Sequence, residues 1–167
     1  NMVQIGRALA DNIGDDGAQL DPPIKTLFVY NSDIANCTPN SGNVRKGMMR
    51  DDLFITVHET FWTDSCMYAD IILPADTALE RTDCHWAYGS WFLGINKPVI
   101  EPLGESINNT ELFRMLADKM GYVDSTDNAF TQTDEEIIKD ILLEAENEDG
   151  ERFNCLTEGI DYDDVVK

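Results

Sequence analysis

Three polar residues, His58, Glu59 and Thr63, stand in a pattern that could hold a ligand. His58 and Glu59 follow a short apolar run at 54–57, and Thr63 precedes the acidic start of a predicted helix at Asp64. A carboxylate such as Glu59 can accept two hydrogen bonds from a ligand. A threonine at a helix start can cap the helix with its hydroxyl, and the free N–H groups there can bind a phosphate. These residues form a candidate ligand site.

Each residue of this group also has an ordinary structural explanation. Glu59 alone would be interpreted as a solvent-exposed loop acid, and Thr63 most simply as a helix cap. His58 could be a strand-end histidine whose ring is hydrogen bonded to the backbone. The residues alone leave the structural and the ligand-binding interpretations of His58 open, and for Thr63 both roles can coexist.

Two short strands are expected to position these side chains. Residues 54–58 and 71–74 are apolar, β-branched runs bounded by polar residues, which is typical of strands buried on both faces of a parallel sheet. Open α/β sheets commonly bind ligands beyond the carboxyl ends of their strands. The loop between the two strands is therefore predicted to lie at the ligand-binding edge of a sheet.

The remaining elements are predicted from apolar spacing and from terminal residues. Helices are expected over residues 2–13, where Gly14 provides a stop, over 41–51 and 108–121, and from Thr133 onward, with a strand over 24–30. Asn108 and Thr133 each stand three residues before a glutamate, as in a capping box. The last two helices are expected to cover a sheet. In the helix at 108–121, the apolar face would be formed by Leu112, Phe113, Leu116 and Met120.

Composition excludes several classes of protein. The formal charge is −20, from 32 acidic and 12 basic residues, so nucleic acid and anionic membranes are not expected as partners. This acidity is interpreted as a solvated surface or as an adaptation to high salt. No run approaches the roughly 18 apolar residues that span a bilayer, so direct membrane insertion is not expected. The 4 cysteines form no CxxC pair, and zinc or iron–sulfur ligation has no local support.

Several strings in the chain resemble the dimethyl sulfoxide reductase family of molybdopterin oxidoreductases. They are His58-Glu59-x-x-x-Thr63, Ala69-Asp-Ile-Ile-Leu-Pro74 and Glu80-Arg-Thr-Asp83, and the similarity extends from Met2 to Gly121. Members of this family are several times longer than 167 residues, so the resemblance implies a fragment of a catalytic subunit. It implies a Rossmann-like three-layer α/β/α fold with a mostly parallel sheet. We expect residues 1–143 to form part of one cofactor-binding domain, and residues 144–167 an acidic linker with a short terminal helix.

The resemblance also implies which residues contact a cofactor. The family's loop after the first strand reads Asn-x-Asn-Pro, whereas this chain has Asp33 and Ile34 at the last two positions. A carboxylate only accepts hydrogen bonds where an amide also donates. Glu80 and Arg81 are expected to form a structural ion pair. The predicted cofactor-binding residues are Asn31, Ser32, Asp33, His58, Glu59, Thr63 and Asp83.

The implied cofactor is molybdopterin guanine dinucleotide with molybdenum, bound by the parent enzyme and not retained by this fragment alone. The fragment is expected to supply one wall of that site, with no catalytic or metal-ligating residue of its own. The parent would catalyse two-electron redox chemistry or oxygen-atom transfer, in the cytoplasm or the periplasm. Its remaining domains, and an iron–sulfur electron-transfer subunit, are the implied partners.

A second hypothesis comes from the aromatic segment Trp86–Phe92. This segment belongs to a predicted long irregular connection that reaches Gly104, and an isolated domain would struggle to cover its aromatic side chains. The alternative is therefore a non-catalytic acidic α/β module that binds a protein partner through Trp86–Phe92. An ordinary nucleotide-binding protein is disfavoured, because the chain lacks a glycine-rich phosphate loop.

Overall fold

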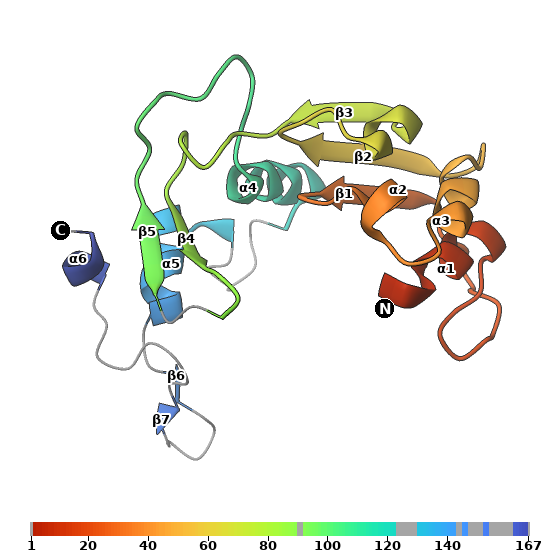
Figure 1. The fold of residues 1–167 in the computed structure, drawn as a ribbon, viewed down its shortest axis with the longest axis horizontal. Coiled ribbons are helices and arrows are strands. Elements are labelled where there is room, and N and C mark those ends of the chain that lie inside the picture. Colours follow the sequence, from red (N-terminus) through yellow and green to blue (C-terminus); the bar gives the residue numbers. More distant parts are fainter. Residues whose placement is uncertain are drawn as a thin grey trace. The chain divides into compact units, whose positions relative to one another are not determined.

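The computed structural model describes residues 2–89, 92–122, 130–142, 145–146, 152–153 and 162–166. The chain falls into two compact units, Asn1–Ala75 and Asp76–Lys167, which we call the first and the second unit (Figure 1). The domain division expected between residues 143 and 144 lies outside the described residues and stays a prediction.

The first unit is built on a parallel sheet of three strands in the order β1 (Thr26–Tyr30), β2 (Phe54–Glu59) and β3 (Ile71–Pro74). The strands predicted at 54–58 and 71–74 are confirmed, and β1 begins two residues later than expected. Tyr30 lies beside His58, and Glu59 lies beside Pro74. The carboxyl ends of all three strands therefore meet at one edge of the sheet.

Short helices precede and connect these strands. They are the 3-10 helix η1 (Met2–Gln4), α1 (Ile5–Asp11), α2 (Ile34–Cys37), α3 (Ser41–Met48) and the 3-10 helix η2 (Asp64–Tyr68). The first predicted helix ends at Asn12, whose backbone is left-handed with φ of 58°, and not at Gly14. The helix predicted over 41–51 ends at Met48.

The core of the first unit lies on one face of its sheet. Its buried side chains are Leu9, Val29, Ala35, Val44, Met48, Leu53, Ile55, Val57 and Cys66. The opposite face carries Tyr30 and Phe54, each 47% exposed, and β3 exposes Ile71 and Ile72. The prediction that the strands at 54–58 and 71–74 are buried on both faces is wrong at Phe54 and along the edge strand β3, whereas His58, on the same face as Phe54, is fully buried.

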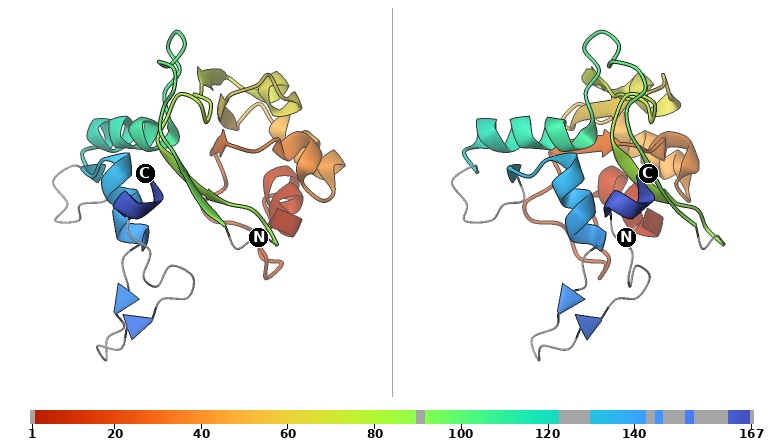
Figure 2. Two further views of the ribbon diagram at one scale, coloured as in Figure 1. Left: turned by 60° about the vertical axis from the view of Figure 1, so that its left-hand side comes forward. Right: turned by 90° about the vertical axis from the view of Figure 1, so that its left-hand side faces the viewer.

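The second unit contains an antiparallel pair, β4 (Asp83–Trp86) and β5 (Leu93–Asn96), and the helices α4 (Asn109–Met120), α5 (Asp134–Leu142) and α6 (Tyr162–Val165) (Figure 2). A further short pair joins β6 (Ala145–Glu146) and β7 (Arg152–Phe153). The sequence predicted an irregular connection in this part of the chain, and that prediction is wrong for the residues that form β4 and β5. These strands pair because Cys84, Leu93 and Ile95 pack against Ile138, Leu142 and Tyr162.

The helix caps predicted at Asn108 and Thr133 are confirmed, and at Thr133 both bonds of a capping box form. Asn108 Oδ1 accepts the Glu111 N–H at 2.7 Å, while Thr133 and Glu136 exchange side-chain-to-backbone hydrogen bonds of 2.7 and 3.3 Å. Gly121 ends α4 in a left-handed conformation. Only Ala117 is fully buried on α4, and Leu116 and Met120 are 39% and 58% exposed, so the sheet-covering role predicted for this helix stays a prediction.

None of the helices described here combines the length and the hydropathy needed to cross a membrane.

Candidate functional site

Asn31 and Ser32 stand at the carboxyl edge of the sheet in the first unit. Tyr30 pairs with His58, so Asn31 follows the end of β1 and Glu59 ends the neighbouring strand β2. Asn31 is exposed and has a left-handed backbone with φ of 50°. The Asn31 and Ser32 side chains form no hydrogen bond with another described residue. Both can therefore donate and accept hydrogen bonds at this edge.

Glu59 is the last residue of β2, and Thr63 lies on the loop that follows it. Glu59 is half-buried; its Oε1 accepts the Thr60 N–H at 2.8 Å, and its Oε2 has no partner in the described part of the chain. The predicted cap at Thr63 is wrong, because the hydroxyl lies 3.6 Å from Cys66 Sγ and makes no capping bond to the backbone. Only its carbonyl oxygen contributes, accepting the Cys66 N–H at 3.1 Å.

Asp33 takes the place at the start of η2 that was expected for Thr63. Its Oδ1 accepts the N–H of Ser65 at 3.1 Å and the Ser65 hydroxyl at 2.7 Å, and its Oδ2 accepts the Asn36 amide N–H at 2.9 Å. Burial by itself would raise the pKa of Asp33, but the hydrogen bonds from Ser65 and Asn36 outweigh it and lower the pKa below 3.8. An ionised carboxylate of the chain thus occupies the start of η2.

His58 is completely buried at the end of β2, between Tyr30 of β1 and Leu73 of β3 in register. This placement favours a packing role for the ring. The cofactor contact predicted for His58 stays a prediction.

Asp83 belongs to the second unit, at the start of β4. Its Oδ2 accepts Arg81 Nε–H at 3.0 Å, and its Oδ1 accepts the Cys84 N–H at 2.8 Å. Arg81 also pairs with the buried Asp76 at 2.7 Å. The predicted Glu80–Arg81 pair is wrong, because Glu80 instead accepts two backbone N–H groups, at 2.6 and 2.8 Å.

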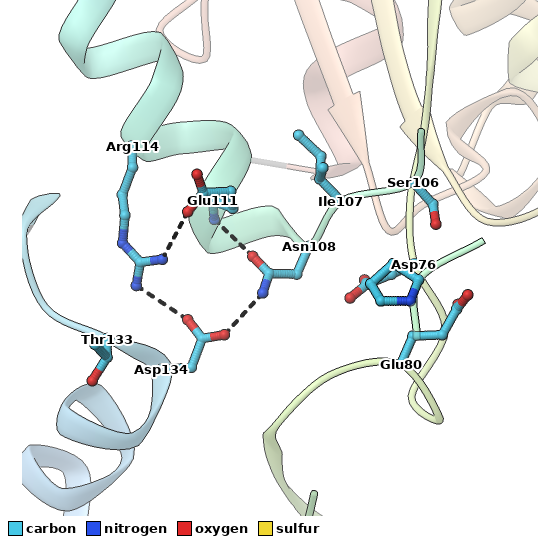
Figure 3. Close-up of a pocket in the computed structure, with 10 residues that line it drawn as sticks. Asp76, Glu80, Ser106, Ile107, Asn108, Glu111, Arg114, Thr133 and Asp134 are labelled. Atoms are coloured by element: carbon cyan, nitrogen blue, oxygen red, sulfur yellow. Dashed lines mark hydrogen bonds and ion pairs between the residues drawn. The ribbon is translucent and has the colours of Figure 1, made fainter. Parts of the chain in front are cut away.

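A polar hollow in the second unit was not predicted from the sequence (Figure 3). Its volume is about 360 Å³, and its lining residues are Asp76, Glu80, Pro102, Ser106, Ile107, Asn108, Glu111, Arg114, Thr133 and Asp134. The sequence contained only one indication of this hollow, the predicted helix caps at Asn108 and Thr133. The caps mark two helix starts, but they do not predict that these helix starts lie next to each other.

Asp134 is the centre of this hollow's hydrogen-bond network. It accepts from the Asn108 amide at 2.8 Å and from Arg114 at 3.1 Å, and Arg114 also pairs with Glu111 at 3.3 Å (Figure 3). These carboxylates have partners within the protein. Across the described residues, no three His, Cys, Asp or Glu side chains are grouped to hold a metal ion.

Comparison with known proteins decides the family. A family model described as molybdopterin oxidoreductase matches residues 14–119. The chain belongs to the molybdopterin oxidoreductases. This confirms the resemblance to the dimethyl sulfoxide reductase family that the strings around His58 and Asp83 predicted.

Two curated relatives show how much of a longer protein this family member represents. The chain is 41% identical over 167 residues to "Probable oxidoreductase YoaE" of Bacillus subtilis, covering 100% of the chain and 22% of that protein. It is 34% identical over 131 residues to the dimethyl sulfoxide/trimethylamine N-oxide reductase of Rhodobacter capsulatus, covering 72% of the chain and 16% of the relative. The chain therefore spans less than a quarter of either relative, and the prediction of a fragment of a larger enzyme is confirmed.

A solved structure supports the fold. The acetylene hydratase from Pelobacter acetylenicus matches with a TM-score of 0.57 and 28% sequence identity, over 71% of this oxidoreductase fragment and 16% of that chain. The fold is mixed α/β with a parallel three-stranded sheet, similar to part of that enzyme. The three-layer Rossmann-like arrangement stays a prediction.

Proposed function

We propose that the chain supplies one wall of a molybdopterin guanine dinucleotide site in a molybdenum-dependent oxidoreductase. The wall is the carboxyl edge of β1, β2 and β3 in the first unit. The observation that carries the proposal is that Asn31 and Ser32 follow the end of β1 and Glu59 ends the neighbouring strand β2, each with polar atoms not used by another described residue. Family membership supplies the class of cofactor.

The chemistry of these groups fits the guanine and ribose part of the dinucleotide. The Asn31 amide and the Ser32 hydroxyl donate and accept hydrogen bonds, and Glu59 Oε2 can accept from guanine N–H groups or ribose hydroxyls. The Thr63 hydroxyl lies on the same loop. A phosphate does not fit at the start of η2, because the Asp33 carboxylate is already hydrogen bonded there and would repel a second anion.

The other three predicted residues have weaker claims to direct contact. His58 is buried, Asp33 is directed at Ser65, and both oxygens of Asp83 are hydrogen bonded within the second unit. We keep His58 as a packing residue of the wall and Asp83 as a separate cofactor contact to be tested in the second unit.

The bound cofactor supplies two-electron redox or oxygen-atom transfer chemistry, and this chain contributes binding and orientation. The remaining domains of the longer enzyme would complete the site, and an iron–sulfur subunit is a further proposed partner. The chain alone is not proposed to be catalytic.

The test is Glu59→Ala in the full-length enzyme that contains this segment. We expect molybdenum and guanine nucleotide per polypeptide, measured after purification without oxygen, to fall roughly tenfold, as for loss of about 1.4 kcal/mol of binding free energy. Asp51→Ala is the matched control, because Asp51 is an exposed turn acid in the same unit. Unchanged content in Glu59→Ala would exclude the Glu59 contact. Absence of both components from the wild type would exclude the proposed function.

That last outcome would favour the alternative hypothesis of a non-catalytic module. Within Trp86–Phe92, Tyr88 and Phe92 are fully or largely exposed, as a partner-binding surface requires. Residues 90 and 91 of this segment lie outside the described residues.

A further inference from the structure

Two loops at the proposed cofactor edge are joined through one buried serine. The first loop follows β1 and contains Asn31–Asp33, and the second follows β2 and leads into η2. Ser65 of η2 has no exposed surface, and its hydroxyl donates to Asp33 at 2.7 Å and accepts the Ala35 N–H at 3.2 Å. Its own N–H donates to the same Asp33 oxygen at 3.1 Å. Ser65 thus binds both Asp33 of the first loop and Ala35 of the helix α2 that follows this loop.

An outer layer of polar contacts closes around this serine. The Asn36 amide nitrogen lies 2.9 Å from Asp33 Oδ2 and 2.9 Å from Asp64 Oδ2. Arg45 of α3 donates to the Ala35 carbonyl at 3.0 Å, hydrogen bonds Asn36, and pairs with Asp64 at 3.6 Å. The side chains of Asn36, Arg45 and Asp64 are more exposed to solvent, so the buried bonds of Ser65 are the dominant connection.

We propose that Asp33 is a positioning residue of the cofactor edge and not a cofactor contact. It acts through Ser65 to fix the loop that carries Asn31 and Ser32 against the loop that carries Glu59 and Thr63. This inference rests on the proposed function, since those four residues are its proposed contacts.

Two features of the first loop support a positioning role. Asn31 has a left-handed backbone, a turn conformation that asparagine adopts more readily than most residues other than glycine. Asp33, two residues later, is bonded to Ser65 and Asn36 and so anchors the chain just after this turn. Asp33 also accepts from three donors and donates to none, so it suits the chain's own N–H and O–H groups.

The donor pattern predicts a graded series of variants. Asp33→Asn keeps one carbonyl oxygen for Ser65 but places an NH₂ group opposite the Asn36 amide, so it should weaken the outer contact alone. Asp33→Ala removes all three bonds. Ser65→Ala fills nearly the same volume and removes only the hydroxyl.

The experiment uses the full-length holoenzyme and measures the rate of guanine nucleotide release, together with peptide-resolved amide hydrogen exchange. We expect Asp33→Ala and Ser65→Ala each to speed release on the order of tenfold, as for residues that orient a ligand-binding group, with Asp33→Asn intermediate. The double variant of Asp33→Ala and Ser65→Ala should release nucleotide no faster than either single variant, because the two side chains act as one unit. Exchange should rise in residues 31–36 and 60–65, remain unchanged in α1 and β2, and be unaffected by the control Asp51→Ala.

Three results would overturn the inference. Release could be faster in Asp33→Ala but normal in Ser65→Ala, which would make Asp33 a direct contact. Exchange could rise across α1 and β2, which would make the network a general stabiliser of the fold. Nucleotide could be lost from Glu59→Ala yet retained at the wild-type rate by Asp33→Ala, which would leave the proposed function standing and remove the positioning role. A wild-type enzyme without guanine nucleotide would overturn both.

Discussion

Each of the two units is stabilised internally by a different kind of contact. The first unit packs a continuous apolar core between three helices and one face of a sheet, and places its polar network at the edge. In the second unit, the buried apolar cluster of described residues is Ile138, Leu142 and Tyr162, while α4 leaves Met115, Leu116 and Met120 exposed. Hydrogen bonds around Asp134 and Glu80 hold its helix starts and loops. Packing therefore fixes the first unit, and side-chain hydrogen bonds contribute more to the second.

The largest expected effect tests the packing of the first unit. In Gly47→Ala the new Cβ would lie 2.4 Å from Leu9 Cβ and 2.7 Å from the Leu9 carbonyl carbon, so α1 must move away from α3. We expect the free energy of unfolding to fall by about 1–3 kcal/mol. This loss outweighs the gain of up to about 1 kcal/mol from the helix propensity of alanine. Urea unfolding of the 167-residue chain measures it, and hydrogen exchange assigns it to the first unit.

Gly42→Ala is the matched control on the same helix, because a Cβ there meets no atom within 4 Å. Its stability should be unchanged or raised. Equal losses in the two variants would show that the close approach at Gly47 does not limit the first unit.

A smaller effect tests the hydrogen bonds of the second unit. Asp134→Ala removes the acceptor shared by Asn108, Thr110 and Arg114, and we expect a loss of about 1–2 kcal/mol. Hydrogen exchange in residues 108–120 and 133–142 should rise. Asp118→Ala, at an exposed position of α4, should stay within about 0.5 kcal/mol of the wild type. If both substitutions had the same effect, packing and not Asp134 would hold α4 and α5.

The smallest effect tests how little surface charge adds to the first unit. Hydrogen bonds from Arg50 and Lys25 hold the pKa of Asp52 well below its ordinary value of 3.8. Because the folded pKa is depressed, this stabilisation is fully present above the unfolded pKa and is lost as pH falls through the folded pKa. The side chain is 51% exposed, so the contribution is small and screened by salt.

The measurement compares unfolding of the wild type and Asp52→Asn from pH 7 to pH 3, at low and high salt. The difference in stability should shrink below about pH 4 and shrink further at high salt. A difference that does not change with pH would contradict the depressed pKa.

Local patterns predicted the features that depend on neighbours in sequence. The strands at 54–58 and 71–74 and the caps at Asn108 and Thr133 all depend on residues within a few positions. The hairpin of β4 and β5 was missed, because its stability comes from packing against α5 and α6, which lie about 40 to 80 residues further along the chain.

The sequence by itself determined the family, because the strings around His58, Pro74 and Asp83 match it in residues and spacing. It also determined that the strands at 54–58 and 71–74 belong to a parallel sheet. Only the tertiary structure decided what the polar side chains at those strand ends do. Asp33 is directed at Ser65, 32 residues away, and its carboxylate lies at the start of η2, where Thr63 was expected to be the cap. His58 is buried and Glu59 keeps one open oxygen, although the two are adjacent in sequence. Alternate residues of a strand face opposite sides of the sheet, so their surroundings depend on what packs there.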